Sequence, residues 1–103
     1  MDFRASVAAR QISDRSEWSV NAAGALMLSI PHCLPSAPEK LTLSGGVCRV
    51  DFGTNGSFPV PVPDIVAPFL DRAATVLLVT FRRTNIVYET DVFVDRGGPE
   101  TGE

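Results

Sequence analysis

The chain has 103 residues, which is enough for one compact domain and too few for two ordinary ones. Hydrophobic residues make up 45% and charged residues 20% of the sequence, so one apolar core can form without disulfides or metal. Twelve acidic residues against nine basic ones give a net charge of −3, which disfavours binding to a nucleic-acid backbone.

Other features of the sequence bear on where the protein works. The N-terminal residues carry charges at Asp2 and Arg4 with no apolar run behind them, so we expect no secretory signal. The longest apolar stretch, residues 22–30, is far shorter than the roughly 20 residues that a membrane span needs. Cys33 and Cys48 are too few for a disulfide framework. We therefore expect a cytoplasmic protein with no membrane partner.

The first segment of the chain alternates apolar and polar side chains. Phe3, Ala5, Val7 and Ala9 lie at every second position between residues 3 and 10. Because side chains of a strand point alternately to its two faces, this pattern predicts a half-buried strand.

The next segments predict a hairpin followed by a loop. Trp18 and Val20 precede a short turn, and Leu26 and Leu28 follow it. Pairing Val20 with Leu26 and Trp18 with Leu28 puts all four side chains on one face, as expected for an antiparallel hairpin. Three prolines then break regular structure and predict a long loop over residues 31–39.

A second hairpin is predicted around residues 45–46, two glycines that can adopt the positive φ angles of a tight two-residue turn. This turn pairs Leu43 with Cys48 on the inner face. It also pairs Lys40 with Asp51 on the outer face, so charged and apolar residues both find suitable partners.

Residues 58–63 alternate Phe58 and two valines with three prolines. The N–H groups of alternate residues point to the same side of a strand, so the prolines remove donors from one edge only. We expect a wide loop that closes on a pair formed by Phe52 and Phe58, with the missing donors turned outward. This segment is then an edge strand that does not readily accept a further strand.

One helix is predicted over residues 64–73, with Asp64 as its N-cap. Apolar residues recur there at helical spacing, and Pro68 keeps the helix short or distorted. Two long strands follow over residues 75–82 and 86–94, and alternating apolar residues in both predict a C-terminal hairpin.

This last hairpin has two apolar faces. Pairing Phe81 with Ile86 and Val79 with Tyr88 gives one face suited to the core. The opposite face carries four apolar and two acidic side chains, which are Val76, Leu78, Val87, Phe93, Glu89 and Asp91. It is too apolar to be wholly exposed and too charged to be wholly buried, so it is the candidate protein interface. A cover formed by the predicted helix or by a second sheet is the structural alternative.

Together these elements predict a mainly β domain over residues 1–95, with a flexible tail over residues 96–103. About seven short strands, with one short helix before the C-terminal hairpin, indicate a small antiparallel sandwich or a partly open barrel. An α+β sheet packed on the helix is the alternative.

Few residues are suited to catalysis. His32 and Cys33 are adjacent, but neighbouring side chains in an extended loop point apart, and the chain has no second histidine to act as a base. Paired-ligand spacing for zinc and glycine-rich phosphate loops are absent from the sequence, so we expect no metal and no cofactor. Arg82 and Arg83 at the hairpin tip, with Arg72 nearby, form a candidate anion contact.

By exclusion, the sequence predicts a small non-enzymatic protein-binding module that acts through the surface of the last hairpin. An accessory or inhibitor protein of the kind encoded by phages and mobile elements fits this description. The partner is another protein or a second copy of the chain, as in a homodimer. Two alternatives stay open: a structural homo-oligomer, and a ligand-binding barrel or enzyme with a site near Trp18, Tyr88 and the loop over residues 31–39.

Overall fold

The computed structural model describes residues 3–83 and 85–96 of the chain. In order, its elements are α1 (Phe3–Arg15), β1 (Glu17–Val20), β2 (Leu26–Pro31), β3 (Lys40–Ser44), β4 (Val47–Asp51), the 3-10 turn η1 (Gly53–Asn55), β5 (Ser57–Val60), α2 (Ala67–Arg72), β6 (Thr75–Arg82) and β7 (Asn85–Asp95).

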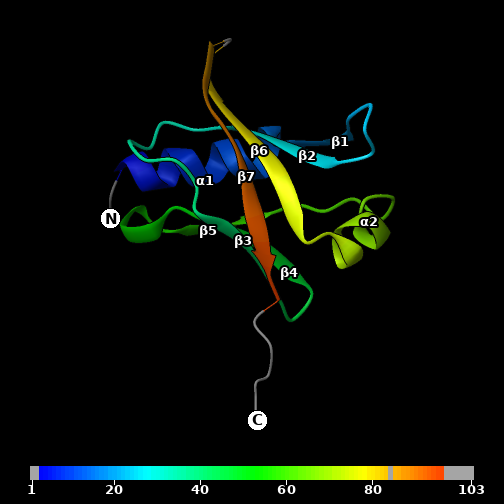
Figure 1. Cartoon of the computed structure of the whole chain (residues 1–103). Coiled ribbons are helices and arrows are strands. Elements are labelled where there is room, and N and C mark those ends of the chain that lie inside the picture. The colour runs from blue at the N-terminus through cyan, green and yellow to red at the C-terminus, as the bar shows by residue number, and fades with distance from the viewer. Residues whose placement is uncertain (1–2, 84, 97–103) are drawn as a thin grey trace.

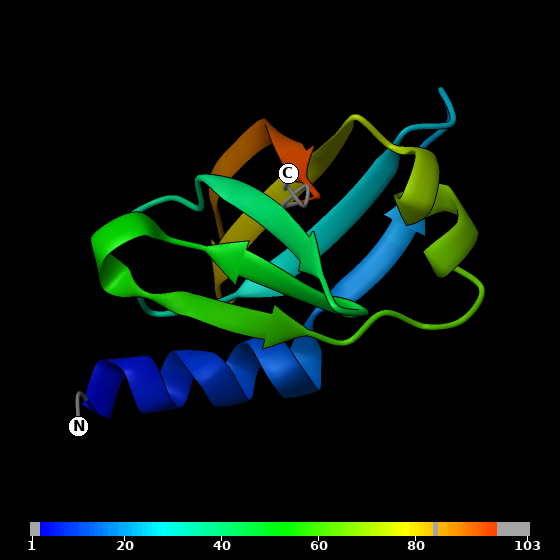
Figure 2. The same cartoon turned by 90° about the horizontal axis from the view of Figure 1, so that it is seen from below.

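The strands form one curved sheet in the order β1-β2-β6-β7-β3-β4-β5. This sheet curls into a half-barrel, and α1 lies along its open side, where it contacts both β2 and β5 (Figure 1 and Figure 2). The mainly β fold and the partly open barrel are thereby confirmed. The β2–β6 and β3–β7 pairs are parallel, so the sheet is mixed and not wholly antiparallel.

The first segment forms α1, so the prediction of a strand over residues 3–10 is wrong. Four apolar residues also recur at helical spacing, at Ala5, Ala8, Ala9 and Ile12. Ala8 and Ile12 are fully buried in the core. Alanine is the strongest helix former, and a short alternation of apolar residues fits a helix as well as a strand. The small side chains of this alanine stripe pack on the core along the open side of the half-barrel.

The two hairpins predicted from the first half of the chain are confirmed. Trp18 lies opposite Leu28 in the β1–β2 pair, and Leu43 lies opposite Cys48 in the β3–β4 pair. Residues 45 and 46, both glycine, have φ angles of 59° and 78°, as a tight turn of this kind requires. Local turn chemistry therefore sets these two registers.

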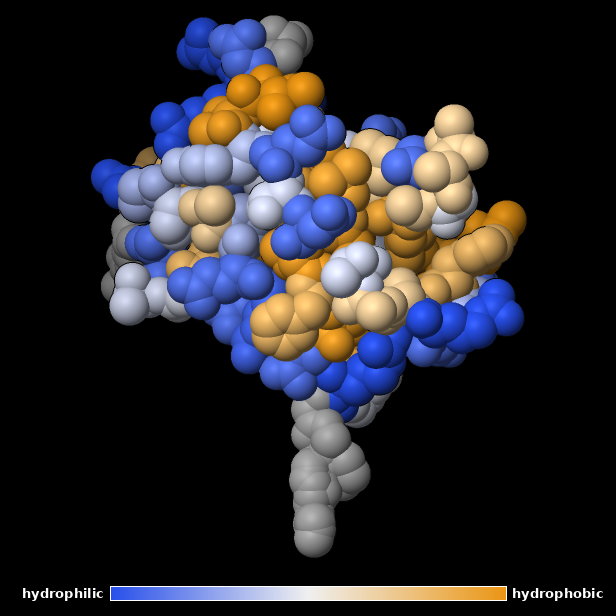
Figure 3. Space-filling model, viewed as in Figure 1, coloured by the Kyte–Doolittle hydropathy of each residue, from blue (hydrophilic) through white to orange (hydrophobic). Residues whose placement is uncertain are grey.

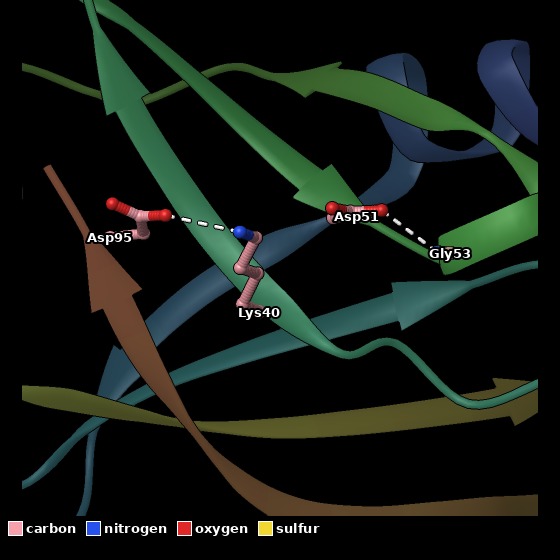
Figure 4. A network of polar contacts seen from close by, with 4 residues as sticks. All are labelled: Lys40, Asp51, Gly53 and Asp95. Atoms are coloured by element: carbon pink, nitrogen blue, oxygen red, sulfur yellow. Dashed lines mark hydrogen bonds and ion pairs between the residues drawn. The ribbon is translucent and has the colours of Figure 1, made fainter. Parts of the chain in front are cut away.

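Strand β5 is an edge strand as predicted, but its expected register is wrong. Phe58 lies opposite Val50 and not opposite Phe52. The loop is tighter than expected because Gly53 adopts a φ of 68° and its N–H donates to the Asp51 carboxylate at 2.8 Å (Figure 4). Phe58 still points into the core, because the shift is by two residues.

Helix α2 is shorter than the predicted helix over residues 64–73. It begins after Val66, and the expected N-cap Asp64 lies in the turn before it. Leu70 is its buried residue. At its C-terminal end, the guanidinium of Arg96 donates to the carbonyl oxygens of Leu70 and Ala73 at 2.8 Å each. Arg96, assigned to the tail by sequence, is thus held in place; residues 97–103 lie outside the described residues.

The β6–β7 hairpin contains a β-bulge that the sequence did not predict. Phe81 pairs with Ile86 as expected, but Thr80 then pairs with Tyr88, which leaves Val87 as the extra residue. Because a slip of one residue turns a strand over relative to its partner, the even-numbered side chains of β6 face the core. The predicted core face of β6 is therefore its outer face.

Candidate functional site

The bulge divides the predicted protein interface into two groups. Val76 and Leu78 are 1% and 0% exposed in the core, so the prediction that they share an exposed face with the other four residues is wrong. The other four, which lie on β7, are exposed: Val87, Glu89, Asp91 and Phe93. Phe93, at 55%, is the most exposed apolar side chain of the six.

A different apolar stripe accompanies them on the outside of the sheet. Leu77, Val79 and Phe81 of β6 lie on this side, next to Met27 and Pro31 of β2. Val79 is buried yet does not belong to the core cluster, so its neighbours on the outer side shield it. This stripe was not predicted from the sequence, because the bulge that turns β6 over has no sequence signature of its own.

We call this surface the outer hairpin face and define it as Met27, Leu77, Val79, Phe81, Phe93, Glu89 and Asp91. Figure 3 shows this side of the molecule, with hydrophobic side chains gathered over β6 and β7 and hydrophilic ones among them. The acidic pair lies on β7 directly opposite the apolar stripe, since Asp91 pairs with Leu77 and Glu89 pairs with Val79.

Strand β7 also presents an open edge. Within residues 3–83 and 85–96, β3 pairs with β7 only at Val94 and Asp95. The opposite edge of β7 is paired with β6 from Asn85 to Phe93, apart from the bulge at Val87. We call residues 85–93 the open β7 edge. In Figure 1 the tip half of this hairpin extends beyond the other strands.

The ladder geometry shows which backbone groups reach this edge. The N–H of Val94 donates to the carbonyl of Ala74 at 2.9 Å, so Val94 bonds toward β6. Because bonding alternates along an antiparallel pair, Thr90 and Val92 also bond toward β6. The N–H and C=O groups of Glu89 and Asp91 then point to the open side, where they can pair with another strand.

An ion pair lies at the point where β3 leaves β7. The Lys40 ammonium is 3.0 Å from the carboxylate of Asp95 (Figure 4). The hydrogen bond to Asp95 and the negative charge of that carboxylate raise the pKa of Lys40. This contact joins the two halves of the sheet at the base of the open β7 edge.

The adjacent residues His32 and Cys33 do not form a nucleophilic pair. The His32 ring is buried against Phe52, and its Nδ1 accepts the N–H of Leu34 at 3.0 Å. The Cys33 thiol instead donates to the carbonyl oxygen of Arg4 at 3.6 Å. Burial, together with the positive charge of Arg82, lowers the pKa of His32 to about 4, so the ring is neutral near pH 7.

Both cysteines are free thiols. Burial raises the pKa of Cys48 to about 11, so this thiol stays protonated near neutral pH and is a poor nucleophile. In the part of the chain that the structure describes, no group of three or more histidine, cysteine or acidic side chains is placed to hold a metal ion.

The residues proposed for a ligand site between the sheets lie apart. The Trp18 indole N–H donates to the carbonyl of Pro61 at 2.8 Å and so links β1 to the segment after β5. Tyr88 lies on β7, and strands β2 and β6 separate it from β1, a distance of about 14 Å across a sheet. His32 is the buried polar residue of the loop over residues 31–39.

Comparisons with protein-family models, curated proteins and solved structures found no match for this chain. None of the helices in the described residues is long and apolar enough to span a membrane. The outer hairpin face and the open β7 edge are the features of the molecule that suit a binding role.

Proposed function

We propose that this protein is a non-enzymatic protein-binding module that takes an extended segment of a partner onto the open β7 edge. The observation that supports it is a strand edge that no other described residue of the chain pairs with, lying directly beside exposed apolar and acidic side chains. In strand addition, the main-chain hydrogen bonds supply affinity and alternate side chains supply specificity. The open β7 edge offers the main-chain hydrogen bonds, and the outer hairpin face offers the side-chain contacts.

The charges on β7 define the chemistry of the partner. Glu89 and Asp91 are exposed and lie two residues apart, so they project from the same face of the strand. A partner strand with Lys or Arg at alternate positions places a cation opposite each carboxylate, and each such pair contributes roughly 0.2–1 kcal/mol. Apolar side chains of the partner then extend the contact over Phe93.

The same charges disfavour a second copy of the chain as the partner. If two β7 strands paired antiparallel about Thr90, Glu89 of each copy would lie opposite Asp91 of the other. Like charges in directly opposite positions are destabilising in a sheet. A basic extended segment from another protein is therefore the favoured occupant.

A selection from a library of displayed ten-residue peptides tests the mode of binding. We expect the protein to enrich peptides with basic residues at alternate positions and apolar residues near them. Asp91→Pro removes a backbone donor from the open edge and should abolish the enrichment. Asp91→Asn keeps that donor and should relax only the preference for basic residues. Enrichment that is equal on Asp91→Pro would contradict strand addition.

The native partner can be tested through the exposed apolar side chains of β7. A protein captured from the host should be identified, purified and titrated against the Val87→Glu and Phe93→Glu variants. The matched control is Phe69→Glu, because Phe69 is exposed to a similar extent, at 48%, but lies on α2. We expect the two β7 variants to lose binding and the control to keep it. Equal binding by all three folded variants would overturn the proposed function.

Self-association is the third outcome to examine. Sedimentation at high protein concentration should show a monomer. A dimer that Asp91→Pro dissociates would show that a second copy occupies the edge, and the proposal of a basic partner segment would then be wrong.

A further inference from the structure

A small pocket lies where the end of α1, the end of β2 and the end of β6 meet. Its volume is about 200 Å³. The residues that line it are Gln11, Arg15, Pro31, His32, Phe81, Arg82 and Arg83. It lies beside the end of β6 that leads into the hairpin turn and uses none of the acidic residues of the open β7 edge.

Two buried polar atoms belong to residues of this pocket and have no hydrogen-bond partner in the described part of the chain. These atoms are Nε2 of His32 and Oε1 of Gln11. His32 is only 3% exposed, and its Nδ1 already accepts the N–H of Leu34. The neutral ring therefore carries its proton on Nε2, which makes this atom a buried donor. Buried polar groups are normally satisfied, so an unpaired donor here indicates an acceptor that the chain does not supply.

The charge of the pocket indicates what kind of acceptor fits. Arg15 comes from the end of α1, and Arg82 and Arg83 come from the end of β6 and the residue after it; the lining residues of the described chain include no carboxylate. Asp14 lines the neighbouring groove on the outer side of α1. Planar guanidinium groups match the oxygens of phosphate better than a lysine ammonium does. Gln11 can turn its terminal amide to present either its oxygen or its NH₂ group.

The backbone at Arg83 is a further observation. Its φ is 59°, which places a residue with a bulky side chain in the left-handed region that favours glycine. Such conformations cost stability and are concentrated at functional sites. Keeping arginine at this position therefore retains a guanidinium beside the pocket at the expense of backbone strain.

We propose that this pocket binds a phosphate group, held by the Nε2–H of His32 and the guanidinium groups of Arg15, Arg82 and Arg83. The three arginine charges exceed the two negative charges of a phosphate dianion, and the buried imidazole supplies a neutral donor. The sequence suggested an anion contact at Arg82 and Arg83 with Arg72 nearby; the structure instead brings Arg15 to this place.

Titration with inorganic phosphate at constant ionic strength, followed by NMR, tests the proposal. The chain contains one histidine, so the imidazole signals need no assignment, and the Hε2 resonance should shift as phosphate accepts a hydrogen bond from Nε2–H. Arg83→Gly and Arg15→Gln should each weaken binding about tenfold, the loss expected for one charge-assisted hydrogen bond. Arg72→Gln, a matched loss of charge on α2, should change affinity by less than about twofold.

Titrations with O-phosphoserine and with acetate identify the source of the phosphate and test whether the pocket prefers phosphate to another anion. Tighter binding of O-phosphoserine than of inorganic phosphate would indicate that the pocket takes a phosphate ester, and the reverse would indicate the free ion. Equal binding of acetate would overturn the assignment to phosphate. The proposed site would be wrong if phosphate did not shift the Hε2 resonance, or if Arg72→Gln weakened binding as much as Arg83→Gly and Arg15→Gln do.

Discussion

Strands β5 and β7 both expose an edge, but their sequences treat it in opposite ways. On β5, Pro59 lies opposite Arg49 at a position where its missing N–H faces outward, and α1 contacts the strand. Strand β7 contains no proline and keeps all its donors. The comparison shows that the fold prevents strand pairing at one edge and leaves it available at the other.

On β7 the edge is protected by charged side chains, whereas on β5 it is protected by a proline that lacks an N–H group. Proline prevents any strand from pairing, whereas Glu89 and Asp91 repel only strands that carry negative charge. An edge protected in this way is selective. This difference is the physical basis for proposing a basic partner at β7 and none at β5.

The largest change in stability that we expect comes from His32, which is buried on the side covered by α1. Its pKa falls from 6.5 to about 4 on folding, which corresponds to about 3 kcal/mol at ~1.4 kcal/mol per pKa unit. The unfolded chain takes up the proton first, so this stability is complete above about pH 6.5 and is lost as the pH falls toward 4. Urea unfolding from pH 7 to pH 4 measures the loss. A histidine that titrates near 6.5 in the folded protein would contradict the prediction.

A pair of proline substitutions tests which backbone groups of β7 are free. Thr90→Pro removes a donor that bonds to β6 and should lower the free energy of unfolding by about 1–3 kcal/mol, because a buried carbonyl loses its partner. Asp91→Pro removes a donor that faces outward and should cost clearly less. Chemical denaturation of both variants gives the comparison. If Asp91→Pro is the more damaging of the two, the edge is not open as described.

The contact between β1 and the segment after β5 can be weakened by a substitution at Trp18. Its indole N–H bonds to the carbonyl of Pro61, so Trp18→Phe should lower the free energy of unfolding by about 1 kcal/mol, the usual contribution of one hydrogen bond. Hydrogen exchange in β5 should become faster, while exchange in the β6–β7 ladder stays unchanged. Uniform acceleration in all strands would show that this contact does not specifically secure the β5 side.

The smallest effect on stability is expected from restoring a donor to the β5 edge. Pro59→Thr should change the free energy of unfolding by less than about 0.5 kcal/mol, as is usual for an exposed position. It should nevertheless promote association at high concentration, which light scattering detects. Val47→Thr, an exposed position on the neighbouring strand β4, is the control for surface change without a new edge donor. A monomeric Pro59→Thr variant would show that other features protect this edge.

The parts of the fold that sequence predicted correctly depend on neighbouring residues. The β1–β2 and β3–β4 registers follow from short turns with alternating apolar residues on each side. The β5 register failed by two residues because the Asp51 carboxylate binds the N–H of Gly53 and tightens the turn. Sequence patterns resolve a hairpin when the turn is common and miss it when one side chain reshapes the loop.

The candidate sites depended on features that no local pattern reveals. The bulge at Val87 moved Val76 and Leu78 into the core and turned Leu77 outward. The open β7 edge exists because β3 leaves β7 above Val94, and the phosphate pocket forms where α1 meets the end of β6. These contacts join segments distant in the chain, and the α1 segment itself was predicted as a strand.

The ion pair between Lys40 and Asp95 sets a limit on any docking segment. It links β3 to β7 just beyond Phe93. A bound peptide that extends along β7 toward the C-terminus therefore reaches the position that β3 already occupies. Measured from Asn85, the vacant length is nine residues, or about 30 Å at 3.3 Å per residue. The junction between β3 and β7 therefore limits the length of peptide that can pair, and peptides longer than nine residues should gain no further affinity.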